Sequence, residues 1–219
     1  MNLSISDAAQ LLQVSERTIR RWVETYGLPE RPSDGEATYG RDELIEWADQ
    51  HSLRLARDVP GEEDGPQIGL AEAISIGGVH HDVPGEDVET ALHAVAQRLL
   101  LPDLVDREFF WQVLLAREDL GSTGVGDGVA VPHLRRPLVL HVDSPLAGLF
   151  FLDQPVDWAA LDGKPVDALF VVVSPGVRAH LHLLSRISFA LRDEALRHLL
   201  ADHAGQQTLL ARLAELDRR

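Results

Sequence analysis

A break in composition constrains the fold of this 219-residue chain more than any other feature of its sequence. Residues 57–67, RDVPGEEDGPQ, bring glycine, proline and acidic residues together with almost no apolar side chains. Such a segment is typical of a linker, because it offers too little apolar surface to join a core. We therefore predict two domains, residues 1–57 and 68–219, joined by a linker over residues 58–67.

Composition excludes several classes of chemistry. The chain has no cysteine, which rules out disulfides, thiolate zinc sites and cysteine nucleophiles. No apolar run approaches the roughly 20 residues of a membrane helix, and the sequence MNLSISDAAQ lacks the pattern of a signal peptide. We expect a cytoplasmic protein with no membrane association. The net charge of -15 repels nucleic acid, so any DNA contact must be local.

Helical and strand-like patterns alternate after the linker. EDVETALHAVAQRLL and DREFFWQVLLARE have helical periodicity, whereas DALFVVVSP and LVLHVDSPLAGLFFL are typical of buried strands. From about His180 the chain is helical again. This alternation predicts an α/β or α+β layered domain rather than a helical bundle.

Residues 124–137, GVGDGVAVPHLRRP, carry the strongest signal for chemistry. Pro132 fixes its own backbone and favours an extended residue before it, so His133 is held on a stiff stalk. The preceding glycines allow tight turns and let an anion approach backbone amides. From spacing alone, a histidine in such a place is more often a surface or turn residue, so the loop by itself does not establish a site.

The neighbouring side chains favour an anion site. Ser122 and Thr123 offer hydroxyl donors, and Arg117 lies at the end of a predicted helix, where its guanidinium can clamp phosphoryl oxygens. Neutral imidazole, with an ordinary pKa of about 6.5, can attack phosphorus without a separate base. These residue types together fit phosphoryl transfer, which depends on positioning and charge neutralisation.

The chain after the linker resembles the type-2 enzyme IIA domain of the bacterial phosphotransferase system, the fructose, mannitol and nitrogen-regulatory class. Three motifs match in order: LAREDLGSTGVGDGVAVPH, DGKPVDALFVVVSP and AHLHLLSRISFALRD. The resemblance implies a mixed β-sheet flanked by helices. It also implies that His133 takes a phosphoryl group from the phosphocarrier protein HPr or a paralogue, with Arg117 neutralising charge and His180 as a second active-site histidine.

Further expectations concern the residues around His133. Ser122, Thr123 and Gly124 would bind the phosphate. His180 and His182 are about 200° apart on a helix, so only one of them can face the site. The family usually has a very small residue or proline after the active histidine, and Leu134 at this place is expected to affect how the donor protein fits.

Before the linker, SISDAAQLLQ and VSERTIRRWVETYG predict two short helices, with Ser6 and Ser15 as N-caps, and DELIEWADQH predicts a third. Arg17, Arg20 and Arg21 lie on one face of the second helix, opposite the apolar residues. That is the geometry of a recognition helix in a major groove.

Residues 1–55 resemble the helix-turn-helix domain of the MerR and excisionase families, through LSISDAAQLLQVSERTIRRWVETYGLPE and YGRDELIEWA. The resemblance implies that Thr18, Arg20 and Arg21 face DNA and that residues 30–41 form a wing, making a small all-α winged domain. Yet residues 1–57 hold seven arginines against ten acidic residues. A helical protein-interaction domain without DNA affinity is the alternative, and DNA binding by so small a module would favour a homodimer.

Three functions fit these patterns. The first is a phosphorelay regulator in which phosphorylated His133 alters DNA binding. The second is a DNA-binding protein whose other domain senses or oligomerises without phosphorylation. The third is a sugar-transport IIA component with a vestigial helix-turn-helix, served by a separate IIB protein. No cofactor is expected, and no metal either: adjacent strand residues His80 and His81 point to opposite faces and lack partners at ligand spacing.

Overall fold

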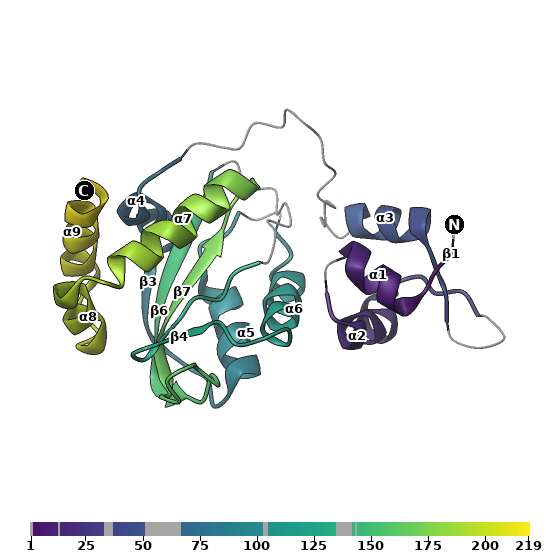
Figure 1. Ribbon diagram of the computed structural model, residues 1–219, viewed down its shortest axis with the longest axis horizontal. Helices are drawn as coiled ribbons and strands as arrows, with labels where there is room; N and C mark the ends of the chain where they lie inside the picture. Colours follow the sequence, from purple (N-terminus) through teal and green to yellow (C-terminus); the bar gives the residue numbers. More distant parts are fainter. Residues whose placement is uncertain are drawn as a thin grey trace.

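A computed structural model describes residues 2–12, 14–32, 37–50, 67–102, 105–134, 142 and 144–219. The predicted linker, apart from Gln67, lies outside the described residues, and so does much of the predicted wing. Figure 1 shows the N-terminal helices on one side of a larger layered domain. Within the described ranges, none of the helices combines the length and hydropathy needed to cross a bilayer.

The N-terminal part is helical, as predicted, with one small strand pair. Its elements in chain order are β1 (Asn2–Leu3), α1 (Ile5–Leu12), α2 (Glu16–Tyr26), β2 (Tyr39–Gly40) and α3 (Arg41–Gln50). Strands β1 and β2 pair antiparallel. This pair joins the residues before α1 to the residues before α3, in a part of the chain that is otherwise helical.

The caps of the first two helices show how the chain turns between them. Ser15 is the N-cap of α2, as predicted, and its side chain accepts a hydrogen bond from the Thr18 amide. Ser6 lies inside α1 and is not its cap. The Ser4 hydroxyl instead accepts a hydrogen bond from the Asp7 amide at 3.1 Å. The serine two residues earlier thus satisfies a free amide at the start of α1.

The second part contains a mixed five-stranded sheet, which confirms the predicted fold class. The strands are β3 (Val79–Val83), β4 (Gly124–Gly126), β5 (Val129–Ala130), β6 (Leu146–Val156) and β7 (Val166–Val173), in the order β3-β6-β7-β5-β4. Pairs β3–β6 and β5–β7 are parallel, whereas β6–β7 and β4–β5 are antiparallel. Because β5 and β7 run parallel, their carboxyl ends lie side by side at the same edge of the sheet.

Helices cover both faces of this sheet. They are α4 (Leu70–Gly77), α5 (Val88–Arg98), α6 (Arg107–Glu118), α7 (Val177–Ala190), α8 (Glu194–Ala201) and α9 (Gln206–Asp217). Consecutive residues of a strand point to opposite faces, so Phe150 belongs to the cluster with α5 and α6, and Phe151 to the cluster with α4 and α7–α9. In Figure 1, α5 and α6 lie on the side of the sheet nearer the N-terminal helices.

The N-terminal helices pack against α6, and the hydrophobic cluster is continuous across the contact. The ring centroids of Trp22 and Phe109 lie 5.5 Å apart, and Trp47 lies 6.3 Å from the same phenylalanine. The Arg21 guanidinium donates a 3.1 Å hydrogen bond to Gln112 Oε1. The sequence patterns suggested separate cores, whereas the structure joins them through one helix.

Candidate active site

His133 lies at the carboxyl end of the parallel strand pair. It follows β5 and forms a single parallel bridge with Val172 of β7. Its ring Nδ1 is 2.7 Å from the Val131 carbonyl oxygen. Because a carbonyl only accepts hydrogen bonds, Nδ1 carries the proton in the neutral ring, and the lone pair is on Nε2. The side chain is half-buried, so a partner molecule can still reach it.

The charge state of His133 suits a nucleophile. Burial lowers the pKa of the imidazole below its ordinary value, the hydrogen bond with Val131 opposes this shift, and the positive charge of Arg117 adds to it. The ring is therefore neutral at neutral pH. A neutral imidazole keeps the unshared electron pair that attack on phosphorus requires.

His180 stands next to His133, in the first turn of α7. The two ring centroids are 5.6 Å apart with 41° between the ring planes. His180 is only 3% exposed, and its Nε2 has no hydrogen-bond partner among the described residues. Burial, followed by the charge on His133, lowers the pKa of His180 to about 4. This unpartnered nitrogen can bind an arriving anionic oxygen only when it carries a proton, which the low pKa disfavours until such an anion is present. His182 does not line the cavities at this site.

Arg117 closes the other side of the site. It lies in the last turn of α6, and its Nη1 donates a 2.8 Å hydrogen bond to the Gly121 carbonyl. Its side chain lines the same cavity as His133 and His180, a space of 440 Å³. The three predicted catalytic side chains are thus gathered from α6, the end of β5 and α7. Their catalytic roles remain predictions.

The hydrogen-bond donors of the predicted phosphate-binding loop are already used in bonds within the protein. The Ser122 hydroxyl donates to the Trp158 carbonyl and accepts from the Gly124 amide, the latter at 3.0 Å. The Thr123 hydroxyl and amide donate to the two Glu118 carboxylate oxygens, at 2.6 and 2.7 Å. In this conformation these donors hold the loop in shape, so binding phosphate would require them to exchange partners.

Glu118 and Trp158 are parts of the site that the sequence patterns did not single out. Both meet at Thr123, whose hydroxyl also accepts a 3.2 Å hydrogen bond from the indole of Trp158. Glu118 lies within a quoted motif directly after Arg117, which was its only signal. Its partner Trp158 comes from a distant part of the chain, and no local pattern reports that contact.

A second cavity of 570 Å³ continues from the site along the glycine-rich hairpin. It shares Arg117, Ser122 and His133 with the smaller cavity. Large apolar side chains stand exposed nearby: Leu120, Val125, Leu161 and Leu181. An apolar rim around a half-buried polar centre is typical of a surface that receives another protein.

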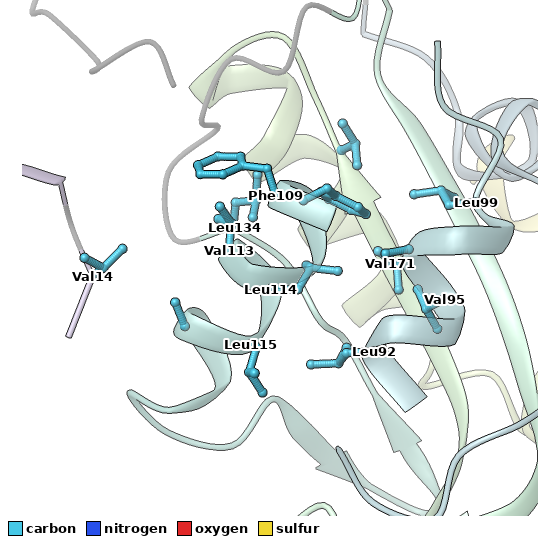
Figure 2. Close-up of a cluster of buried hydrophobic side chains, with 14 of the residues drawn as sticks. Val14, Leu92, Val95, Leu99, Phe109, Val113, Leu114, Leu115, Leu134 and Val171 are labelled. Atoms are coloured by element: carbon cyan, nitrogen blue, oxygen red, sulfur yellow. The ribbon is translucent and has the colours of Figure 1, made fainter. Parts of the chain in front are cut away.

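Leu134 does not extend onto that surface. Its side chain is 3% exposed and belongs to the cluster that includes α6. Figure 2 shows it among the buried side chains, with Phe109 and Val113 of α6. The expectation that this leucine alters the fit of a donor protein is therefore corrected: it packs inward. Arg135 and Arg136, which follow it, lie outside the described residues.

The rings of His80 and His81 pack against phenylalanine rings of β6. The ring of His80 stacks on Phe150 with 4.6 Å between centroids and is bonded to the Gly77 carbonyl. Among the residues with defined positions, no three histidine or acidic side chains gather into a metal-binding group.

The four predicted DNA-binding residues have different surroundings. Arg17 and Arg20 are exposed on α2. Arg21 is half-buried and bonded to Gln112. Thr18 is only 5% exposed, so it does not share the open face of the helix. Its hydroxyl is hydrogen-bonded to the N-cap serine at 2.9 Å. The structure thus leaves two of these side chains open to a ligand.

The fold and the histidine pair define a phosphotransferase-type class of protein, and the family comparison agrees. Residues 73–216 match the family "Phosphoenolpyruvate-dependent sugar phosphotransferase system, EIIA 2", and residues 3–52 match a helix-turn-helix domain family. The chain belongs to the EIIA 2 family and carries an N-terminal helix-turn-helix domain.

Individual relatives place it near the nitrogen regulatory branch. It is 39% identical over 132 residues to a nitrogen regulatory protein of Pseudomonas aeruginosa, covering 58% of this chain and 82% of that protein. It is 34% identical to the nitrogen regulatory protein of Escherichia coli, covering 59% and 77%. The crystal structure of nitrogen regulatory protein IIA-Ntr from Neisseria meningitidis superposes with a TM-score of 0.57 at 27% identity, covering 65% of this chain and 97% of that one.

Proposed function

We propose that this protein is a phosphohistidine carrier and regulator, which accepts a phosphoryl group on His133 from HPr or a paralogue. One observation carries the proposal: the Val131 carbonyl holds the Nδ1 proton, which leaves the Nε2 lone pair available in a half-buried cavity. As the Nε2–phosphorus bond forms, the bond from phosphorus to the donor atom breaks, and that atom keeps the electron pair. No proton has to leave Nε2.

Arg117 and His180 would stabilise the transferred group. The guanidinium offers positive charge from one side of His133, and the His180 ring offers an unpartnered nitrogen from the other. A phosphoryl dianion beside His180 would favour its protonated form, so a ring that is neutral before transfer could become a charged donor after it. The group could then pass to a second partner, including a separate IIB protein.

Labelling with a phosphate donor tests this function. We expect incubation with enzyme I, HPr and phosphoenolpyruvate to add one acid-labile phosphoryl mass, measured by intact mass spectrometry. The variant His133→Ala should take up none, whereas His182→Gln, changed on the outer part of α7, should label like the wild type. Absence of labelling in the wild type would favour the alternative in which the IIA-like domain only senses or oligomerises.

Regulation is favoured over a transport role by the contact between the domains. Helix α6 carries Arg117 at one end and receives Trp22 and Arg21 of the helix-turn-helix domain along its side. A vestigial N-terminal domain would not be expected to keep a buried contact with α6, the helix that supplies Arg117. The proposed regulator would act in the cytoplasm, where HPr is found, and on DNA as a homodimer.

A further inference from the structure

A continuous chain of hydrogen bonds runs from the Glu118 carboxylate to the His133 ring. The Thr123 amide donates to Glu118 Oε1 at 2.7 Å. The Thr123 carbonyl accepts from the Val131 amide at 3.0 Å. The Val131 carbonyl in turn accepts from His133 Nδ1 at 2.7 Å. The backbone of Thr123 and Val131 therefore links an acidic side chain to the nucleophile's ring through three hydrogen bonds, each donated toward the Glu118 end.

The carboxylate end of this chain is firmly held. Glu118 Oε2 accepts a second hydrogen bond from the Thr123 hydroxyl at 2.6 Å, and that hydroxyl is held by Trp158. Burial raises the pKa of Glu118, while the bonds from Thr123 and the charge of Arg117 oppose the rise. An acceptor-only carboxylate matches two donors from one residue, whereas a neutral side chain could not accept both with the same geometry.

We propose that Glu118 is a positioning residue for phosphoryl transfer at His133, holding the backbone of Thr123 and, through it, that of Val131, so that the ring is fixed with its proton on Nδ1. The inference rests on the proposed phosphoryl transfer and adds the residue that selects the attacking nitrogen. Glu118 does not touch the reacting atoms. Its effect is to hold the Thr123 backbone, and with it the paired Val131 backbone, so that the Val131 carbonyl stays in place for the ring.

This arrangement suits the product as well as the nucleophile. When Nε2 forms a bond to phosphorus, the ring loses electron density and Nδ1–H becomes a stronger donor. A carbonyl already held in line with that proton then binds it more strongly. Outer partners that orient a histidine through its second nitrogen commonly change affinity or activity about 10- to 100-fold when removed.

The first experiment needs no phosphate donor. The tautomer and pKa of His133 are measured by 15N NMR of the full chain in the wild type, Glu118→Gln and Glu118→Ala. We expect the Nδ1–H tautomer to predominate in the wild type and the Nε2–H tautomer to rise several-fold in Glu118→Ala. Glu118→Gln keeps the side-chain shape but loses the negative charge, so the pKa of His133 should fall further below its ordinary value. Asp119→Asn, an exposed carboxylate one residue along, is the matched control.

The second experiment measures the rate of labelling from phosphorylated HPr for the same variants. We expect transfer to slow about 10- to 100-fold in Glu118→Ala and less in Glu118→Gln, with Asp119→Asn within twofold of the wild type. If both Glu118 variants keep the wild-type tautomer and pKa, the inference is overturned, even if labelling slows through loss of structure. If the wild type itself is not labelled, the proposed function fails, and the NMR result still decides whether Glu118 orients the ring.

Discussion

At the scale of single residues, the site contains two histidines that burial holds neutral, each with a different hydrogen-bond arrangement. His133 is partly open, with one nitrogen committed to a backbone carbonyl. His180 is buried, with one nitrogen left without a partner in the described part of the chain. Under the proposed function, the first arrangement would supply the nucleophile, and the second would receive negative charge once its ring is protonated. Placing both within a few ångströms makes each disfavour protonation of the other.

The buried state of His180 should make stability depend on pH. Its pKa is lowered to about 4 in the folded protein, so the unfolded chain binds more protons between about pH 6.5 and pH 4. The free energy of unfolding should therefore fall as the pH drops through this window, with a contribution on the order of 2 to 3 kcal/mol from this ring. Urea unfolding at a series of pH values measures it.

His180→Gln, which cannot titrate, should flatten that pH dependence, and His182→Gln on the same helix should not. If the curves of the wild type and His180→Gln run parallel from pH 7 to pH 4, the ring is not held neutral by burial.

At the scale of elements, α6 joins the two parts of the molecule. Its N-terminal half presents Phe109 and Gln112 to the helix-turn-helix domain, and its last turn supplies Arg117 and Glu118 to the site. Leu134, directly after the nucleophile, packs into the same cluster as this helix. A small movement of α6 would therefore be felt at both ends, because a packed core transmits displacement rather than absorbing it.

A double-mutant cycle tests the contact made by α6. Arg21→Ala and Gln112→Ala should show a coupling of about 1 kcal/mol in the free energy of unfolding of the full chain, since they remove one charge-assisted hydrogen bond. The pair Arg20→Ala and Gln112→Ala is the control, because Arg20 lies exposed on α2 and pairs weakly with Glu16 at 3.7 Å. Equal coupling in the two cycles would mean that Arg21 and Gln112 are not bonded in solution.

At the scale of the whole molecule, the contact sets the helix-turn-helix domain against the EIIA 2 domain. One of the predicted DNA-binding arginines, Arg21, is taken up by that contact, whereas Arg17 and Arg20 stay exposed. The chain carries a net charge of -15, so few other groups can compensate on a DNA surface. Phosphorylation of His133 would add about -1.5 to -2 charges near the C-terminal end of α6. The same helix carries Gln112, which accepts the hydrogen bond from Arg21.

We therefore expect phosphorylation to change DNA affinity. Genomic fragments selected at low salt would be used to compare the unphosphorylated protein, the phosphorylated protein and His133→Ala by fluorescence anisotropy. A difference of at least severalfold between the first two, absent in His133→Ala treated alike, is the expected result. Arg17→Ala should weaken binding in both states. Identical affinities before and after labelling would contradict the coupling, and no binding in any state would favour the protein-interaction alternative.

The sequence by itself determined the class of fold, because hydrophobic periodicity and turn residues are local properties. The runs DALFVVVSP and DREFFWQVLLARE became β7 and α6, and the motif ending in His133 placed that residue at a strand end. It also indicated Arg117 and His180 as its neighbours. It could not show that Thr18 is buried, that Ser4 rather than Ser6 caps α1, or that Leu134 faces inward.

Only the tertiary structure decided which nitrogen of His133 is free, that Glu118 and Trp158 hold the loop at Thr123, and that α6 receives the helix-turn-helix domain. Each of these depends on contacts between residues distant in the chain or on the direction of a single carbonyl. Periodicity records which face of an element is apolar, but it carries no information about what that face meets. Burial and hydrogen-bond direction arise only when the elements pack together.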